Sequence, residues 1–229
     1  MKRGKKYIKV IKDLDRSKNY SVEEAIKEAK KLSYSKFVGT LEVHFDIKIP
    51  KDRDPKSIKG AISLPHSSGT KNVKVAVFTT PDMDKVATAA GADLVGLESL
   101  IKDVKAGKIE FDVAIATPSV MPKIGILGKE LGQKGLMPSP KNGTVTENIA
   151  ETVAEYKKGK QTFACDTSGV IHMSAGKLDL ENEKLLENVH ACVVALEEVL
   201  GKGYTQAMDR MHLAPTMGPS FKIEYSKPE

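Results

Sequence analysis

The chain has 229 residues and a mass of 24.9 kDa, which exceeds the common size of a single domain and favours two. A hydrophobic fraction of 40% with 29% charged residues is typical of a globular protein and excludes a largely disordered chain. The net charge of +6 suits a polyanionic partner but does not identify one. The sequence has no apolar run of the roughly 20 residues that cross a bilayer and no secretory signal, so we expect a cytoplasmic protein without a membrane partner.

The positive charge is concentrated at the two ends of the chain. Residues 66–159 carry 12 basic and 11 acidic side chains, whereas the segments outside them carry 24 basic and 19 acidic ones. The densest group of cations lies at the N-terminus and comprises Lys2, Arg3, Lys5, Lys6, Lys9 and Lys12. Such a group can bind phosphates as a cationic arm or form the solvated face of a helix, and the charge run leaves both interpretations open.

The first third of the chain has the pattern of an α+β structure. Ser21 and Glu24 have the spacing of a capping box, which predicts a helix over residues 21–32. Residues 37–49 alternate between apolar and polar side chains, which predicts a long strand with one exposed face. A loop and a short strand in GAISLP follow.

The middle of the chain follows a different pattern. The compact apolar runs VKVAVF and FDVAIA are separated by helical segments at 83–90 and 97–106, which predicts parallel strands covered by helices. A glycine- and proline-rich stretch at 118–143 precedes a helix over 147–158, and Gly159 is a plausible stop for that helix. We expect a small Rossmann-like, three-layer α/β unit.

The C-terminal part returns to strands with one exposed face. Residues 162–176 predict two short strands around the turn at 166–169, a long helix covers 181–200, and FKIEY is a final strand. The fold class is therefore α/β with two domains. Residues 1–66 and 160–229 form a discontinuous α+β domain, and residues 67–159 form the inserted Rossmann-like domain.

Four glycines, Gly125, Gly128, Gly132 and Gly135, raise the question of a nucleotide-binding loop. Their spacing matches neither the dinucleotide fingerprint nor the phosphate loop, so we interpret them as a tightly turned surface loop. The lysines interleaved with them are Lys129, Lys134 and Lys141. These cations could bring the loop close to a sugar-phosphate chain, while a flexible loop without a partner is the alternative.

The sequence predicts no metal, no cofactor and no catalytic residue. The five histidines are scattered, no nucleophile motif is present, and Cys165 and Cys192 lie far apart, as expected for reduced, buried thiols. An enzyme that holds a nucleotide in the middle domain is the main competing hypothesis.

Two features of the outer segments suit RNA. Phe37 could pack in the core, which its position favours, or cover the sugar edge of an RNA. The turn at 215–219 could offer Thr216 and the backbone of Gly218 to RNA hydroxyls and phosphates, or simply reverse the chain.

Several motifs in order along the chain, among them KFVGTLEVHFDI, GLMPSPKNGTVT and TMGPSFKI, resemble the L1 family of large-subunit ribosomal proteins. The resemblance implies a domain from both termini that binds large-subunit rRNA at the mobile stalk. It also implies help in releasing deacylated tRNA from the exit site and repression of translation of the protein's own operon mRNA. A free monomer, present once in each ribosome, is expected.

The resemblance assigns rRNA binding to positions in four segments of the outer domain. They are Lys36, Phe37, Thr40, Glu42, Asp166, Gly169, His172, Thr216, Met217 and Gly218. The chain departs from the family pattern at Gln133 and Lys134, where Pro-Arg is usual, at Thr167, where lysine is usual, and in the LPHSSGT turn. Lysine lacks the planar fork with which arginine binds phosphate twice, so the contacts of the second domain are the ones affected.

Overall fold

A computed structural model describes residues 4–12, 14–15, 18–48, 54–66, 73–201 and 207–224. The chain divides into two compact units, unit 1 with Met1–Gly69 and Phe163–Glu229, and unit 2 with Thr70–Thr162. These bounds lie close to the predicted boundaries at 66 and 160. That each unit behaves as a domain of its own stays a prediction.

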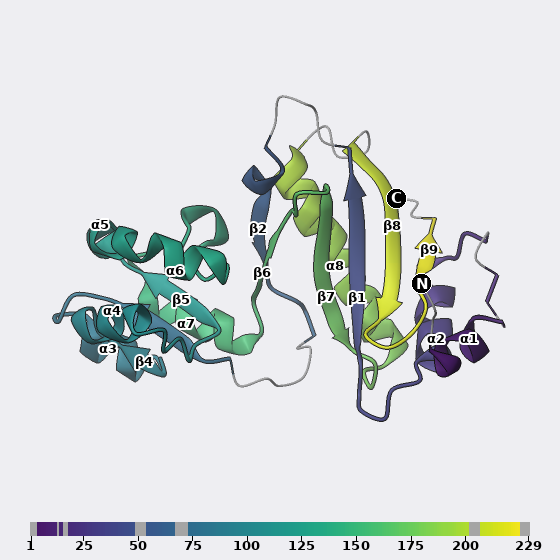
Figure 1. The fold of residues 1–229 in the computed structure, drawn as a ribbon, viewed down its shortest axis with the longest axis horizontal. Helices are drawn as coiled ribbons and strands as arrows, with labels where there is room; N and C mark the ends of the chain where they lie inside the picture. The colour runs from purple at the N-terminus through teal and green to yellow at the C-terminus, as the bar shows by residue number, and fades with distance from the viewer. Residues whose placement is uncertain are drawn as a thin grey trace. The chain divides into compact units, whose positions relative to one another are not determined.

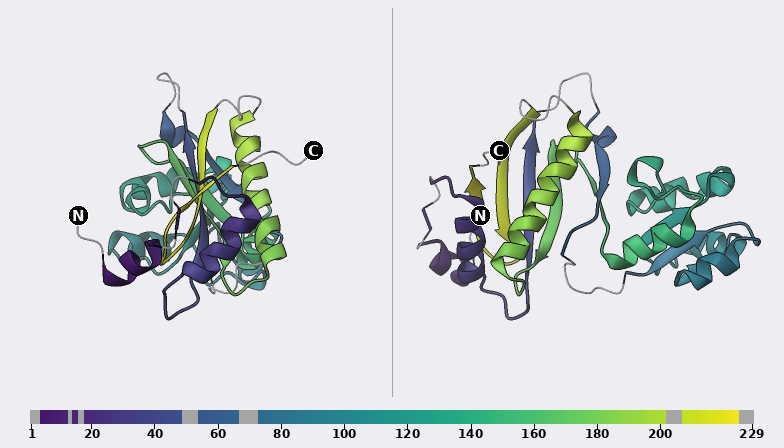
Figure 2. Two further views of the ribbon diagram at one scale, coloured as in Figure 1. Left: turned by 90° about the vertical axis from the view of Figure 1, so that its right-hand side faces the viewer. Right: turned by 180° about the vertical axis from the view of Figure 1, so that it is seen from behind.

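Unit 1 is built around a four-stranded antiparallel sheet with the order β7-β1-β8-β9 (Figure 1). Its strands are β1 (Thr40–Ile47), β7 (Val170–Lys177), β8 (Met208–Pro215) and β9 (Phe221–Ile223). The helices α2 (Val22–Leu32) and α8 (Asn182–Leu200) contact it, and Figure 2 shows α8 running across one face. Two further strands, β2 (Lys59–Ile62) and β6 (Gln161–Ala164), pair with each other, and a 3-10 turn, η1 (Pro55–Ser57), precedes β2.

The helices of unit 1 form where the sequence predicts them. The side chain of Ser21 accepts a hydrogen bond of 3.2 Å from the backbone N–H of Glu24 at the start of α2. This is one of the two hydrogen bonds that the predicted capping box comprises. On α8, buried Leu185, Val189 and Val193 face the core at helical spacing. The predicted helices at 21–32 and 181–200 are confirmed.

The basic N-terminus forms the short helix α1 (Lys5–Ile11), which has no buried residue. This agrees with the interpretation of Lys5, Lys6 and Lys9 as a solvated helix face, and it leaves phosphate binding untested. Lys2 and Arg3 lie outside the described residues.

The alternating pattern predicted for the strand at 37–49 is confirmed, but the strand itself is shorter than predicted. Leu41, Val43 and Phe45 are fully buried and alternate with half-buried polar side chains, as one covered and one open face require. The strand begins at Thr40, so placing Phe37 at its start was wrong. Residues 37–39 belong to the connection between α2 and β1, which spans 33–39.

Strand β8 was missed by the sequence analysis, although it lies beside β1 in the sheet. Met211 and Leu213 alternate with polar residues, but the run is short and ends at Pro215. The two strands predicted at 162–176 exist, but β7 has eight residues and β6 pairs with β2, while a single bridge joins Cys165 to Ile171. Strand pairing depends on distant partners, which a local pattern does not reveal.

Unit 2 has the predicted parallel sheet with helices on both faces. Its strands are β3 (Val75–Phe78), β4 (Leu94–Val95) and β5 (Val113–Ala116), in the order β4-β3-β5, and β4 was not predicted. The helices α3 (Asp84–Ala89) and α7 (Ile149–Lys158) belong to one apolar cluster, and α4 (Glu98–Lys105) belongs to the other. Gly159 ends α7 in the left-handed conformation, as predicted.

The stretch at 118–143 is largely helical, so interpreting it as a turned surface loop was wrong. It contains η2 (Pro118–Val120), α5 (Met121–Ile124), η3 (Gly125–Leu127), α6 (Gly128–Gln133) and η4 (Pro140–Asn142). Ile124, Leu127 and Leu131 are fully buried at helical spacing. Burial of these side chains outweighs the cost of about 1 kcal/mol for each glycine in a helix. Of the four glycines, only Gly135 has a positive φ, of 71°.

Candidate RNA-binding site

The sheet of unit 1 has one face that α2 and α8 leave uncovered. In Figure 1, helix α8 lies behind the strands of this sheet, and in the right-hand view of Figure 2, which is seen from behind, it lies in front of them. The uncovered face bears polar side chains from all four strands, which are Thr40, Glu42, His44, Asp46, His172, Ser174, Arg210, His212 and Lys222. A depression of about 330 Å³ on this face is lined by residues of β1 and β7.

One end of this face is closed by a rigid turn. The backbone N–H of Thr216 donates to the carbonyl of Thr40 at 2.9 Å, and the backbone N–H of Thr40 donates to the Thr216 hydroxyl at 3.0 Å. The proton of that hydroxyl can reach the carbonyl of Thr40 at 3.1 Å or Oε1 of Glu42 at 3.2 Å. These bonds bind the turn to the start of β1.

Packing fixes the next two residues of the turn. A Cβ atom at Gly218 would lie 2.5 Å from Cγ of Pro215 and 3.4 Å from the carbonyl oxygen of Leu32, so only glycine fits. The carbonyl of Met217 accepts a hydrogen bond of 3.2 Å from the backbone N–H of Tyr34. The turn therefore holds together the end of β8, the start of β1 and the segment after α2.

Three large apolar side chains are exposed around this turn. Phe37 is 60% exposed, Val38 52% and Met217 38%, next to the exposed cation Lys36. The expectation that Phe37 packs in the core was wrong, because strand β1 starts only at Thr40 and leaves the ring outside the sheet. We call Phe37, Val38 and Met217 the apolar rim.

A second turn lies at the opposite end of β1. Oδ1 of Asp166 accepts hydrogen bonds of 2.8 Å from the backbone N–H groups of Ser168 and Val170, and Gly169 has a φ of 89°. The bond from Val170, aided by the one from Ser168, holds the pKa of Asp166 below its ordinary value. Because Asp46 pairs with Val170, the turn is about six residues, or roughly 20 Å, from Thr40.

The structure thus separates the ten expected positions. Lys36, Phe37, Thr40, Glu42 and Thr216–Gly218 lie together at one end of the face, and Asp166 and Gly169 lie at the other. His172 lies between the two ends. An elongated ligand could contact both ends, whereas a small molecule could not.

Sequence analysis treated the histidines as scattered, yet the strand register brings three together. His44 pairs laterally with His172 on β7 and with His212 on β8. The Nδ1 atoms of His44 and His172 lie 2.8 Å apart, and Nε2 of His44 lies 3.8 Å from Glu42. Partial burial lowers the pKa of His44, and His172 lowers it further, against the opposing effect of Glu42. A prediction of strand register could have found this cluster.

The lysines predicted to contact RNA in the second domain belong to unit 2. Lys129 lies on α6, Lys134 caps its C-terminus and Lys141 lies in η4. All three are exposed, and the exposed side chain of Ile126 lies between Lys123 and Lys129 in the sequence. This surface is described for unit 2 alone.

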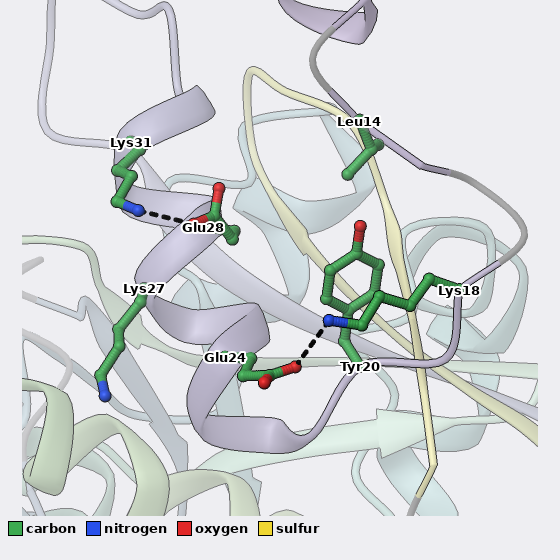
Figure 3. A pocket seen from close by; sticks show the side chains of 7 residues that line it. All are labelled: Leu14, Lys18, Tyr20, Glu24, Lys27, Glu28 and Lys31. Carbon is green, nitrogen blue, oxygen red and sulfur yellow. Dashed lines mark hydrogen bonds and ion pairs between the residues drawn. The ribbon is translucent and has the colours of Figure 1, made fainter.

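A larger depression, of about 420 Å³, lies beside the outer side of α2 (Figure 3). Two of its three lysines are paired, Lys18 with Glu24 at 3.3 Å and Lys31 with Glu28 at 2.6 Å. These pairs neutralise much of its charge, so it is a weaker candidate for a phosphate than the sheet face. Within the described residues, no group of three or more His, Cys, Asp or Glu side chains could hold a metal ion.

Residues 25–219 match the ribosomal protein L1p/L10e family. The chain belongs to this family. It is 43% identical to the large ribosomal subunit protein uL1 of Kosmotoga olearia over 99% of this chain and 98% of the relative. Proteins of the same name from Dehalococcoides mccartyi and Thermosipho africanus are each 43% identical and match 97% of this chain, with 94% and 97% of the relative covered.

Membership of this family decides the class of protein. The chain is a structural constituent of the large ribosomal subunit, which locates it in the cytoplasmic ribosome, and it is not an enzyme. The competing hypothesis of a nucleotide-using enzyme was wrong. No helix among the described residues is long and apolar enough to span a membrane.

Proposed function

We propose that the uncovered sheet face of unit 1 binds folded large-subunit rRNA, with its main contacts at the end that carries the apolar rim and the turn at Thr216–Gly218. The observation that carries this proposal is the exposure of Phe37 and Met217 beside a turn held by backbone hydrogen bonds and by packing. Large apolar side chains kept in water by a rigid scaffold are typical of binding surfaces.

The chemistry of this end suits RNA more than a protein partner. Lys36 can neutralise a phosphate, and the Thr216 hydroxyl and the Glu42 carboxylate can bind ribose 2′-hydroxyl groups. With 5% aromatic residues, the chain offers few rings on which unstacked bases could lie, so we infer recognition of a folded RNA by its shape.

We extend the proposal along the lines that the family resemblance implies. Unit 1 is the rRNA-binding domain and unit 2 the inserted domain, with Lys129, Lys134 and Lys141 as secondary RNA contacts. The protein acts as a single copy at the mobile stalk and assists release of deacylated tRNA from the exit site. It represses its own operon mRNA through an RNA element that resembles the rRNA site.

The deciding test is binding to an rRNA stalk fragment by the whole chain. Met217→Asp places a charge on the apolar rim and should weaken binding by about 30-fold or more, and Phe37→Ala by about tenfold. Val194→Asp and Val194→Ala are matched controls, because Val194 is also exposed but lies on α8, which covers the other face. Equal binding by wild type, Met217→Asp and Phe37→Ala would refute the site.

The same variants test the finer roles. Translation of a reporter behind the operon leader should be repressed by the wild type and by Val194→Asp but not by Met217→Asp. Ribosomes reconstituted with or without the protein should differ in the rate at which labelled deacylated tRNA leaves the exit site. Repression that persists in Met217→Asp, or equal release rates, would remove the corresponding role and leave rRNA binding in place.

A further inference from the structure

A row of basic side chains crosses the uncovered face of the sheet, with one residue on each strand. Lateral pairing places His172 of β7 beside His44 of β1, His44 beside His212 of β8, and His212 beside Lys222 of β9. We call these four residues the basic row. It lies between the two turns of the candidate site, and only His172 is among the ten positions to which the family resemblance assigns rRNA binding.

The bond between His44 and His172 can be kept when the pair gains one proton. In the neutral pair one ring donates through Nδ1–H and the other accepts, so Nε2 of the donating ring carries no proton. One added proton at that Nε2 keeps the bond of 2.8 Å and directs both Nε2–H groups towards carboxylates, Glu42 at 3.8 Å and Asp166 at 4.0 Å. A second added proton would put hydrogens on both Nδ1 atoms and break the bond.

The charged groups around the basic row determine how an added proton changes the binding of a polyanion. Beside His44 on β1 lie Glu42 and Asp46, and Asp166 lies 4.0 Å from His172. The other strands carry the cations Lys177 on β7, Arg210 on β8 and Lys222 on β9. Arg210 pairs laterally with Asp46 and contacts Asp209, which pairs with Lys48 at 2.7 Å. With neutral histidines, the carboxylates of Glu42 and Asp166, within 4.0 Å of His44 and His172, therefore oppose a phosphate that approaches these two rings.

We propose that the basic row is a second RNA-backbone contact, in which the histidines take up a proton when a phosphate of the bound RNA lies over them. The proposal rests on the proposed rRNA site and extends it from the apolar rim towards the turn at Asp166. The proton adds a positive charge between Glu42 and Asp166, and Lys222 supplies the fixed charge at the edge of the row.

Because binding takes up a proton, the direction in which RNA affinity changes with pH can be stated. A phosphate raises the affinity of the imidazoles for protons, so RNA binding is strongest at low pH and weakens as pH rises through the pKa of the complex. Uptake of one proton changes the association constant by up to about tenfold per pH unit in that window. In the free protein His44 starts from a lowered pKa, so the window extends upwards from below 6.5.

The first experiment measures the dissociation constant for the stalk fragment from pH 5.5 to 8.5 at constant ionic strength. Wild type should bind about tenfold more tightly at pH 6.0 than at pH 7.5. His44→Gln and, separately, His212→Gln should flatten the curve. His66→Gln is the matched control, because His66 pairs with Glu187 of α8 at 2.6 Å and is not on the strands of the sheet. A flat wild-type curve, or a curve unchanged in both row variants, would overturn the proposal.

A second experiment tests the phosphate contact without titration. Lys222→Gln should reduce the slope of log affinity against log salt concentration by about one, while the pH dependence stays. An unchanged salt slope would remove Lys222 from the contact. An equal pH dependence with an unrelated duplex RNA would overturn the proposal, because the histidines would then act only as general charge.

The binding experiments distinguish an error in the basic row from an error in the rRNA site itself. If binding is tight and sensitive to Met217→Asp at every pH, but the pH curves of wild type and His44→Gln coincide, only the basic row is wrong. If Met217→Asp binds like wild type at every pH, the site on the sheet is wrong and the inference falls with it.

Discussion

The two turns at opposite ends of the sheet are held by different forces. At Thr216–Gly218 the turn is fixed by packing against Pro215 and by bonds to Thr40, and it is bordered by exposed apolar side chains. At Asp166–Gly169 the turn is fixed by one carboxylate that accepts two backbone N–H groups. We infer that the first turn supplies the fit of shape and the second a polar boundary, so disturbing the first should cost more RNA affinity.

The largest effect should come from Gly218→Ala. The added Cβ would meet Cγ of Pro215 at 2.5 Å, so the turn must move and carry Met217 with it. We expect a loss of about 1–3 kcal/mol of folding free energy from overpacking. RNA affinity should fall about 100-fold, or about 2.7 kcal/mol. Chemical denaturation and RNA titration of the same preparations measure both.

Gly132→Ala is the control for this change. Gly132 lies in α6 of unit 2, and a Cβ there meets no atom within 4 Å. Alanine should stabilise the helix by about 0.5–1 kcal/mol and leave binding of the stalk fragment unchanged. Equal loss of RNA affinity in both variants would mean that the packing of Gly218 is not what shapes the site.

Thr216→Val should have an intermediate effect. Valine keeps the shape of threonine but cannot accept the bond from the N–H of Thr40 or donate to Glu42. We expect RNA binding to weaken about tenfold, whereas Thr216→Ser, which keeps the hydroxyl, should bind within about threefold of wild type. If valine binds as well as serine, the hydroxyl holds neither the turn nor the RNA.

The smallest effect on RNA affinity is expected from Asp166→Asn, which tests the polar turn. The pKa of Asp166 is lowered in the folded protein, so its charge stabilises the fold above the ordinary value of 3.8, and this contribution is lost as pH falls through the lowered pKa. Urea midpoints measured from pH 2 to 6 should therefore fall less steeply for Asp166→Asn than for wild type. Parallel curves would show that the carboxylate bonds do not stabilise the turn.

Patterns within short stretches of sequence predicted most of the fold. The helix cap at Ser21, the alternation in β1, the apolar runs of β3 and β5 and the stop at Gly159 depend on neighbouring residues, and all are found in the structure. The helical stretch at 118–143 was missed because its glycines lower helix propensity, while burial of three apolar side chains decides the outcome.

The candidate site was predictable only as a set of motifs, because family resemblance identifies positions and not distances. Ser21 and Glu24 act through a contact three residues apart, so their role can be inferred from the chain alone. The exposure of Phe37, the bonds between Thr40 and Thr216 and the pairing of His44 with His172 depend on strand register between segments more than 120 residues apart. Register is set by the packing of the whole sheet, so only the tertiary structure assembles these side chains on one face.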